Sequence, residues 1–380
     1  MTDPPVLLGI DFGGTKIATA VCDLAGNKLA SAVVDSHGEQ GARASFSHGV
    51  ATATGLVAAH AAGATVAAVG VATFGIPFED RVELAPAIDG WEELELGREL
   101  RAAFPGAVIR MGTDTKTAAQ AEARWGALAG YDPAIYLNLG TGLAAAIVTG
   151  GRVVSGSQGA SGEIGYSLRE PADVGRAGGL RIPLEDMVSG SALQRRASLQ
   201  GHRLTAAEVF AAAASDADLN DLVSDFVDEL AFHVVNLAIA VNPARIAVGG
   251  GMTRSWDRIG PRLEEALLSG VPYPPDLVLA HFPHDAPLLG AVALAVDAAA
   301  DGAASSEPAS APATVPAVTT GGSAATRPTG TSVNGKNQIN LSKGHYSKQI
   351  TDDAYQRPHG TSPQEPPGPP PIRLTSESKG

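Results

Sequence analysis

The sequence predicts an α/β protein with two lobes, and three observations support this prediction. Strand-like hairpins, helix-like stretches and further strands alternate through residues 1–300, an order that is typical of mixed sheets flanked by helices. The two halves of this region also begin alike, with an apolar strand, a turn that contains glycine and threonine, and a second strand. Finally, 44% of the residues are hydrophobic and 18% are charged, so a sizeable core can be buried.

The first half begins with the apolar run VLLGID at 6–11, which predicts a strand that ends in a carboxylate. Residues 16–34 predict two more strands joined by a turn at 25–27, because Ala-Gly-Asn interrupts the apolar pattern. The other elements expected in this half are a helix over 45–62, strands over 66–72 and 107–110, and a helix over 117–128.

The second half starts with a similar hairpin, in which AIYLNLG (134–140) is followed by LAAAIVTGGRVV (143–154). Residues 244–251 predict a strand that runs into a glycine-rich turn. Helical patterns cover 205–214, 218–240, 255–269 and 286–299.

The composition changes near residue 300. From 301 to 380 the chain is rich in Pro, Ser, Thr, Ala and Gly, and it includes the run PPGPPP at 366–371. Such a segment has too few large apolar residues to offset its ordering entropy, so we expect it to be disordered. Proline-rich segments can bind SH3-like partners, but the composition favours a dispensable extension.

The charge balance and the cysteine count exclude several classes of protein. The formal net charge is -13, from 27 Lys+Arg against 40 Asp+Glu, which argues against a nucleic-acid partner because phosphate binding needs clustered basic residues. The single cysteine, Cys22, excludes an intramolecular disulfide framework and a multi-cysteine metal site. The sequence has no apolar run long enough to span a membrane and no signal-peptide pattern, so we expect a cytoplasmic protein without a membrane partner.

The first candidate site is the segment DFGGTK, in which an apolar strand delivers Asp11 to its carboxyl end. Gly13 and Gly14 would allow the backbone to approach an anion closely, while Thr15 offers a hydroxyl and Lys16 a positive charge. The segment lacks the spacing of a Walker A motif. A tight β-hairpin is an equally good interpretation, because such hairpins also favour Gly-Gly.

Two further glycine motifs close apolar strands in the second half. The motif GTG at 140–142 repeats the glycine and threonine chemistry of the first segment. The motif GGG at 249–251 has no side chains, so a flat base or a ribose could lie against its backbone. Each motif alone could be an ordinary turn, but three such turns after apolar strands favour a binding function.

Two carboxylates complete the candidate set. Asp114 follows the strand expected at 107–110, where ligands bind in many α/β folds. Alternatively, Asp114 or Thr115 caps the helix that is expected from about residue 117. Glu163 lies in the glycine-rich loop GASGEIGY at 159–166, and a plain surface loop is the simpler interpretation of a single glutamate.

Taken together and in this order, the motifs resemble those of the ROK family (repressor, open reading frame, kinase), over roughly residues 5–300. DFGGTK and GTG are similar to the family's two phosphate motifs, and GGG is similar to its adenosine motif. GEIGY at 162–166 resembles the family's GEIGH, and LEDMVSG at 184–190 resembles its LE-x-x-x-SG.

The resemblance implies a two-lobed actin-like ATPase fold, related to ribonuclease H, with a mixed sheet flanked by helices in each lobe. It also implies ATP-dependent phosphorylation of a sugar hydroxyl, usually the 6-hydroxyl, by a cytoplasmic homodimer. On this basis we expect an N-terminal lobe over 1–115, completed by a helix near 286–300, a C-terminal lobe over 116–285, and a tail over 301–380.

The family's functional residues carry over position by position. Asp114 matches the catalytic base, and a carboxylate there can accept the proton of the attacking hydroxyl. Asp11 would place Mg²⁺ through the water shell of the ion. The residues expected to hold ATP are Gly13, Gly14, Thr15, Lys16, Gly140, Thr141, Gly142, Gly249, Gly250 and Gly251, and those expected to contact the sugar are Thr113, Asp114, Glu163, Tyr166 and Glu185.

Several positions depart from the family's pattern. Thr113 stands where the family has an asparagine before the catalytic aspartate, and Ala87 stands at a second asparagine position. Tyr166 replaces a histidine that binds both sugar and zinc. The positions of the three zinc cysteines hold Arg176, Gly178 and Pro183, which offer none of the sulfur or nitrogen ligands that structural zinc needs. We therefore expect no zinc.

The altered sugar-binding residues favour an acceptor other than plain glucose. An amino sugar such as kanosamine, or a cyclitol, would suit a ROK-like kinase of an antibiotic pathway. A glucokinase and a catalytically inactive sugar-sensing regulator remain alternatives. A DNA-binding repressor is disfavoured because the first strand starts at about residue 6 and the charge is negative.

Overall fold

The structure, a computed structural model, describes residues 4–176 and 181–306 of the chain. All of these lie in one compact unit, Met1–Pro316. The predictions made for the tail after residue 306, and for Gly178, lie outside the described residues. Within the described part, no helix is both long and apolar enough to cross a membrane.

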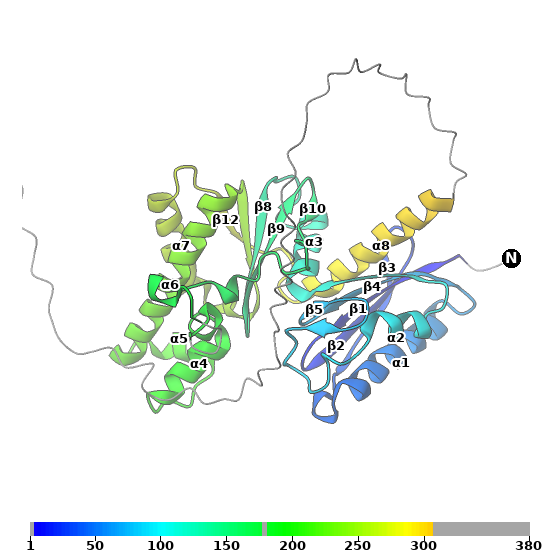
Figure 1. The fold of residues 1–380 in the computed structure, drawn as a ribbon, viewed down its shortest axis with the longest axis horizontal. Helices are drawn as coiled ribbons and strands as arrows, with labels where there is room; N and C mark the ends of the chain where they lie inside the picture. Colours follow the sequence, from blue (N-terminus) through cyan, green and yellow to red (C-terminus); the bar gives the residue numbers. More distant parts are fainter. Residues whose placement is uncertain (1–3, 177–180, 307–380) are drawn as a thin grey trace, which may run out of the picture. The chain divides into compact units, whose positions relative to one another are not determined.

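The first sheet combines an antiparallel hairpin with parallel strands, in the order β3-β2-β1-β4-β7 (Figure 1). β1 pairs antiparallel with β2 and parallel with β4, and β4 pairs parallel with β7. The strands are β1 (Val6–Phe12), β2 (Lys16–Cys22), β3 (Lys28–Asp35), β4 (Val66–Thr73) and β7 (Val108–Thr113).

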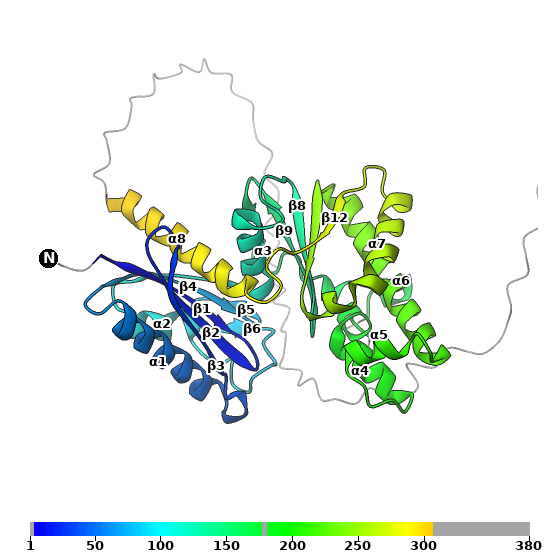
Figure 2. The same cartoon turned by 180° about the vertical axis from the view of Figure 1, so that it is seen from behind.

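Helices cover both faces of this sheet, because its central strands are apolar on both sides. Leu8 and Ile10 of β1 point into the core that contains α1 (Ala42–His60) and α2 (Leu96–Ala103). Leu7, on the opposite face, packs against Leu288 and Val292 of α8 (Ala286–Ser306). Figure 1 and Figure 2 show α1 and α2 on one side of the sheet and α8 on the other. The alternation follows the two-residue period of a strand.

The second sheet repeats this plan in the order β10-β9-β8-β11-β12. The β8–β9 and β9–β10 pairs are antiparallel, whereas β8–β11 and β11–β12 are parallel. The two sheets therefore have the same sequence of pairings, as the similar starts of the two halves suggested. The strands are β8 (Ala134–Leu139), β9 (Leu143–Thr149), β10 (Arg152–Val153), β11 (Arg245–Gly249) and β12 (Asp276–Leu279).

The helices of the second half divide between the two faces of this sheet. Ile135 and Leu137 of β8 belong to the core that includes α6 (Ala217–Val241) and α7 (Trp256–Gly270). Tyr136, on the other face, packs with Ala118 and Ala119 of α3. The remaining helices are α3 (Asp114–Trp125), α4 (Gly190–Leu199) and α5 (Ala206–Ala212).

The predicted alternation of strands and helices is confirmed, with corrections at some boundaries. α3 begins at Asp114 rather than near 117, because Thr113 caps it. α8 extends through Ser306, so the first six residues of the expected tail are helical. The elements that were not predicted are α2, α4, β5 (Ile76–Pro77), β6 (Val82–Glu83), β12 and the short 3-10 turns η1 (Gly38–Gln40), η2 (Ile164–Tyr166), η3 (Pro171–Asp173), η5 (Leu184–Asp186) and η6 (Gly251–Ser255).

Candidate active site

Asp11 and Asp114 both stand at the carboxyl end of the first sheet. Asp11 pairs in register with Ala72 of β4, and Ala72 pairs with Gly112, two residues before Asp114. Burial, together with the charge of Asp114, raises the pKa of Asp11 to about 7. A partly buried carboxylate whose pKa is raised by burial and by a neighbouring carboxylate is typical of functional sites, since a folding role rarely requires it.

Asp114 is the first residue of α3, and its own carboxylate is held by its neighbour. The backbone N–H of Thr115 donates to Asp114 Oδ1 at 2.6 Å, and the Thr115 hydroxyl donates to the same oxygen at 3.2 Å. Burial raises the pKa of Asp114, although these two hydrogen bonds oppose the shift. A carboxylate with a raised pKa is a better proton acceptor near neutral pH.

The helix cap is Thr113, so the alternative interpretation in which Asp114 or Thr115 caps the helix is wrong. Thr113 Oγ1 accepts the backbone N–H of Lys116 at 3.2 Å. The extended backbone of Thr113 and this hydrogen bond are typical of an N-cap. The cap leaves the Asp114 side chain available for another role.

The segment 11–16 is a tight hairpin, as one of its two interpretations proposed. The Gly13 N–H donates to the Lys16 carbonyl at 3.0 Å, and a Cβ on Gly13 would lie 2.8 Å from that oxygen. Ser36 fixes the outside of the turn by donating its hydroxyl to the Gly14 carbonyl at 2.9 Å. The tip residues Gly14, Thr15 and Lys16 are exposed, so a hairpin and a phosphate contact are compatible.

The GTG and GGG motifs line one pocket of about 210 Å³. Gly140 and Thr141 form part of its wall, and their carbonyls accept the N–H groups of Gly190 and Ser191 at 2.9 and 3.2 Å. Gly251 lines the same pocket. The pocket residues that sequence reasoning missed are Gly190, Ser191, Gln194, Ala206, Ala207, Phe210, Met252 and Ser255.

Gly250 shows why the third motif requires glycine. Its φ is 92°, in the left-handed region that L side chains rarely adopt. A Cβ there would overlap the Leu139 carbonyl and would lie 2.7 Å from Asn138 Oδ1. The turn after β11 can therefore lie against the end of β8, which brings the second and third motifs together.

Glu185 links the LEDMVSG segment at 184–190 to the GTG motif at 140–142. The Leu143 N–H donates to Glu185 Oε2 at 2.8 Å, and a Cβ on Gly142 would lie 2.6 Å from the same oxygen. Partial burial, Asp186, Glu163 and Asp114 raise the pKa of Glu185, although the hydrogen bond from Leu143 opposes the shift. The charges of Glu163 and Asp114 act on Glu185, and the charge of Glu163 acts on Asp114, so these predicted site residues lie near one another.

Arginine side chains make hydrogen bonds and ion pairs in the described parts of the loop 166–183, where we expect no zinc. Arg181 donates to the carbonyl of Tyr166 at 3.1 Å, while the Tyr166 side chain is 46% exposed. Arg169 makes a two-pronged ion pair with Glu229 of α6, with an Nη2–Oε2 distance of 3.1 Å. Arg176, at one former cysteine position, pairs with Asp173 at 4.0 Å.

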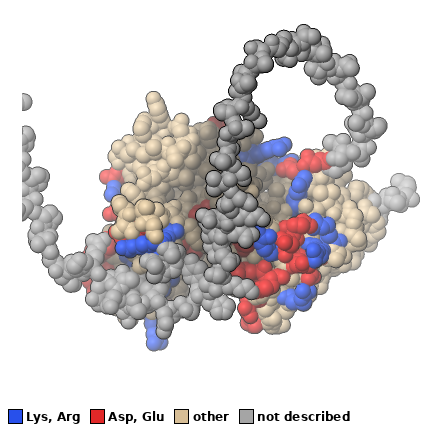
Figure 3. Space-filling view, viewed as in Figure 1, with Lys and Arg blue, Asp and Glu red and all other residues tan. Residues whose placement is uncertain are grey.

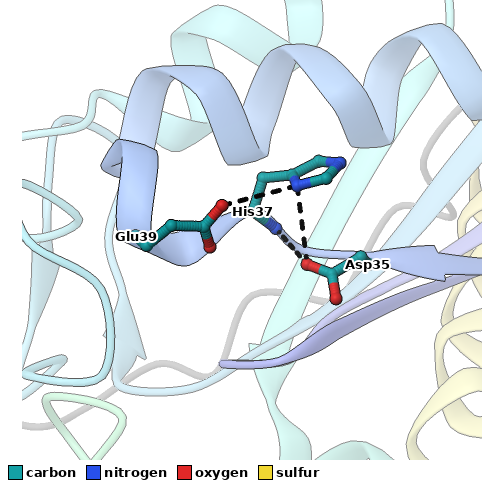
Figure 4. Close-up of side chains that lie close together, drawn as sticks. All are labelled: Asp35, His37 and Glu39. Carbon is teal, nitrogen blue, oxygen red and sulfur yellow. Dashed lines mark hydrogen bonds and ion pairs between the residues drawn. The ribbon is translucent and has the colours of Figure 1, made fainter.

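Among the described residues, one group of side chains between the end of β3 and the η1 turn has metal-ligand chemistry. Asp35, His37 and Glu39 bring one ligand atom each within 4.8 Å of the others (Figure 4). His37 Nδ1 lies 3.7 Å from Asp35 and 3.5 Å from Glu39, and the His37 N–H donates to Asp35 at 2.7 Å. These contacts account for the arrangement, so we assign no metal to it.

The surface of the first half carries mixed charges. On the face seen in Figure 3, basic and acidic side chains are interspersed rather than gathered into a basic surface. Arg43 pairs with Glu99 at 2.9 Å, and Arg81 pairs with Glu83 at 2.7 Å. The described residues that are visible on this face therefore form no continuous basic stripe of the kind that binds nucleic-acid backbones.

Comparison with known proteins identifies the family. The model of the ROK family matches residues 7–298, and the chain therefore belongs to the ROK family. The kanosamine kinase of Amycolatopsis mediterranei is 31% identical over 266 residues, which cover 68% of this chain and 84% of that enzyme. The bifunctional enzyme NanE/NanK of Brucella melitensis is 35% identical over 202 residues, or 53% of this chain and 37% of that enzyme. The match to NanE/NanK thus spans little more than a third of its length.

Two solved structures are similar over most of the chain. The ROK hexokinase of Thermus thermophilus has a TM-score of 0.65 and 29% identity, covering 77% of this chain and 98% of that one. A ROK glucokinase from Streptomyces griseus, in complex with glucose and AMPPNP, has a TM-score of 0.59 and 26% identity. The match covers 76% of this chain and 98% of that one. The predicted two-lobed actin-like ATPase fold is therefore confirmed.

Proposed function

We propose that this protein is an ATP-dependent kinase that phosphorylates the primary hydroxyl of a hexose or hexose-like acceptor. The observation that carries the proposal is the partly buried Asp114, at the carboxyl end of the first sheet, with Asp11, Glu163 and Glu185 near enough for their charges to couple to it. Named sugar kinases among the relatives support the same reaction class.

Each group of site residues has a task in this reaction. Asp114 accepts the proton of the acceptor hydroxyl as its oxygen attacks the γ-phosphoryl group. Thr113, Glu163, Tyr166 and Glu185 orient the acceptor. The exposed hairpin tip at Gly13–Lys16 and the GTG backbone at 140–142 bind the phosphates, and the GGG turn at 249–251 binds the adenosine.

The residues fit a nucleotide with Mg²⁺ better than they fit zinc. Asp11 offers a carboxylate oxygen, the ligand type that Mg²⁺ prefers, and a cation near it would offset the burial and the charge of Asp114 that raise its pKa. Bound Mg²⁺ would neutralise charge on the phosphates. Tyr166, Arg176 and Pro183 offer no thiolate or imidazole for zinc.

For the acceptor we propose an amino sugar, such as 3-amino-3-deoxyglucose (kanosamine), with a cyclitol as the next choice. The similarity to a kanosamine kinase supports this choice. Thr113 distinguishes the site from the family's pattern, because its hydroxyl already accepts the Lys116 N–H at 3.2 Å and offers fewer polar contacts to a sugar hydroxyl than an asparagine side chain would. A cytoplasmic homodimer is part of the same proposal.

The reaction is tested with a coupled ADP assay on a panel of glucose, 3-amino-3-deoxyglucose, N-acetylmannosamine and a cyclitol. Asp114→Asn should lower kcat about 10²–10⁴-fold while nucleotide affinity stays nearly unchanged, because general-base catalysis contributes on that scale. Near-full turnover in this variant would refute the assignment of the base. ADP release that no acceptor stimulates would refute the kinase.

The acceptor is tested by comparing kcat/KM for glucose and 3-amino-3-deoxyglucose in wild type and in Thr113→Asn. We expect the wild type to prefer the amino sugar and the variant to shift toward glucose by roughly 5- to 150-fold, the effect of one matched or unmatched polar group. Glucose as the best acceptor of the wild type, with the same preference in the variant, would contradict the proposal.

A further inference from the structure

Lys116 is a nearly buried lysine that the sequence motifs did not single out. It is the third residue of α3, two positions after Asp114, and its side chain is only 9% exposed. Its Nζ lies 3.1 Å from Glu163 Oε1, and the Glu163 side chain is 23% exposed. The pair therefore joins two of the proposed site's elements away from bulk solvent.

The folding of α3 does not account for this lysine. Thr113 already caps the helix through the backbone of Lys116, so the side chain adds nothing to the cap. A positive charge in the first turn of a helix opposes the helix dipole. Burying a lysine is also unfavourable unless a partner compensates the charge. Because the Lys116 side chain is unfavourable for the stability of the helix, we look for its role in the proposed active site.

The other half of the pair is anchored to a different element. The Ala145 N–H of β9 donates to the Gly162 carbonyl at 2.8 Å. A Cβ on Gly165 would lie 2.8 Å from the Leu143 carbonyl, so this loop lies closely against β9. The backbone of Glu163 is thus fixed by the second sheet, while its side chain reaches the N-terminus of α3.

We propose that Lys116 is a positioning residue of the acceptor site, which holds Glu163 beside Asp114 so that two carboxylates approach one acceptor from two elements. This inference rests on the proposed function, because Glu163 is assigned there to the acceptor. Without the ammonium group, the two acids would repel each other and Glu163 would lose its ion pair with Lys116.

The electrostatics of Asp114 agree with this arrangement. After burial and the two hydrogen bonds from Thr115, the charge of Glu163 raises the pKa of Asp114 and the charge of Lys116 lowers it. Glu185 and Asp11 add further negative charge to the same neighbourhood. Lys116 is the basic group among those that shift the pKa of Asp114.

The test is a cycle of Lys116→Met, Glu163→Gln and the double variant, with Lys116→Arg as the conservative change. Lys116→Met should raise the acceptor KM roughly tenfold or more, whereas the KM for ATP stays within about twofold. In the Glu163→Gln background the same change should cost less than about threefold, because the partner is already neutral. Lys116→Arg should restore most of the acceptor affinity.

Thermal unfolding separates positioning from a purely structural role. The double variant should be at least as stable as the wild type, since it buries no unpaired charge, yet it should still bind the acceptor weakly. Lys28→Met, at an exposed lysine of β3, is the matched control and should leave both KM values unchanged. Equal increases in the two KM values, or additive effects of Lys116→Met and Glu163→Gln, would overturn the inference.

Acceptor binding is also followed without turnover, by the rise in Tm that each sugar causes. If a sugar stabilises the wild type but is not phosphorylated, the kinase proposal fails, and a smaller rise in Lys116→Met still supports the positioning role. If the rise is the same in Lys116→Met and wild type, Lys116 does not position the acceptor site. If no sugar either binds or is phosphorylated, both proposals fail.

Discussion

At the scale of single residues, the site combines groups that folding alone would disfavour. Asp11 is a carboxylate at the end of a buried strand, with a second carboxylate, Asp114, close enough to raise its pKa. Lys116 is buried at the positive end of a helix. Proteins keep such groups mainly where binding or catalysis requires them, at a cost in stability.

Asp11→Asn should stabilise the ligand-free protein at neutral pH. The pKa of Asp11 is raised from an ordinary 3.8 to about 7, so between these values the folded state holds a proton that the unfolded state has lost. Stability therefore falls as pH rises from about 4 to about 7. The amide does not titrate and avoids this loss, which amounts to about 2–4 kcal/mol.

The measurement is the free energy of unfolding in urea at pH 5, 6, 7 and 8, without Mg²⁺. The advantage of Asp11→Asn should grow with pH and level off above about pH 7, while kinase activity is lost. An advantage that is constant with pH, or that shrinks as pH rises, would show that Asp11 is not a destabilising buried acid.

At the scale of elements, α8 is joined to the rest of the unit through glycines. A Cβ on Gly290 would overlap the Thr117 carbonyl of α3, and a Cβ on Gly70 of β4 would overlap the Ala291 carbonyl of α8. The helix therefore lies against a strand of the first sheet and against α3 at backbone distance. Because α3 carries Asp114, these contacts also fix the position of the proposed base.

Gly290→Ala should destabilise the protein by about 1–3 kcal/mol, because the added methyl group has no space. Gly55→Ala is the matched control: Gly55 lies inside α1 with nothing within 4 Å of an added Cβ, so the change should stabilise by about 0.5–1 kcal/mol. Urea unfolding measures both. Equal stabilities of the two variants would refute the close approach of α8.

The segment after Tyr166 is joined to α6 by the ion pair between Arg169 and Glu229. Glu229→Gln removes the charge that compensates Arg169 and should cost about 1–3 kcal/mol, because both side chains are at most 25% exposed. Glu265→Gln breaks the exposed pair with Arg262 and should change stability by less than about 1 kcal/mol.

The same loop gives a prediction about metal content. Elemental analysis of the purified protein should find no stoichiometric zinc, and activity should return fully when Mg²⁺ is added after chelation. One zinc per chain, or a loss of activity that only zinc reverses, would show that other ligands replace the family's histidine and cysteines.

At the scale of the whole molecule, every proposed site residue and both sheets lie within residues 6–306. A chain that ends at Ser306 should keep its Tm within about 2 °C and its kcat, because it loses no described element. A chain that ends at 285 should fail to fold, since Leu288, Val292, Ala295 and Ala298 would no longer cover the first sheet. A drop of several degrees for the first truncation would mean that the tail packs on the rest of the chain.

The sequence by itself determined the order of strands and helices, the duplicated start of the two halves and the family. These follow from apolar periodicity and glycine motifs, which are patterns among residues close together in the sequence. The same patterns marked Asp11, Asp114 and the two glycine motifs of the second half as a candidate site. Short elements such as β12 and α4 escaped prediction because they have too few residues to show a period.

Only the tertiary structure decided which residues meet. The Lys116–Glu163 pair joins residues 47 positions apart, and the Arg169–Glu229 pair joins residues 60 positions apart, so no local pattern could predict either. Thr113 caps α3 because β7 extends to that residue and the helix starts directly after it. Contacts between residues distant in the sequence, rather than local propensity, thus determine which charged side chains surround Asp114.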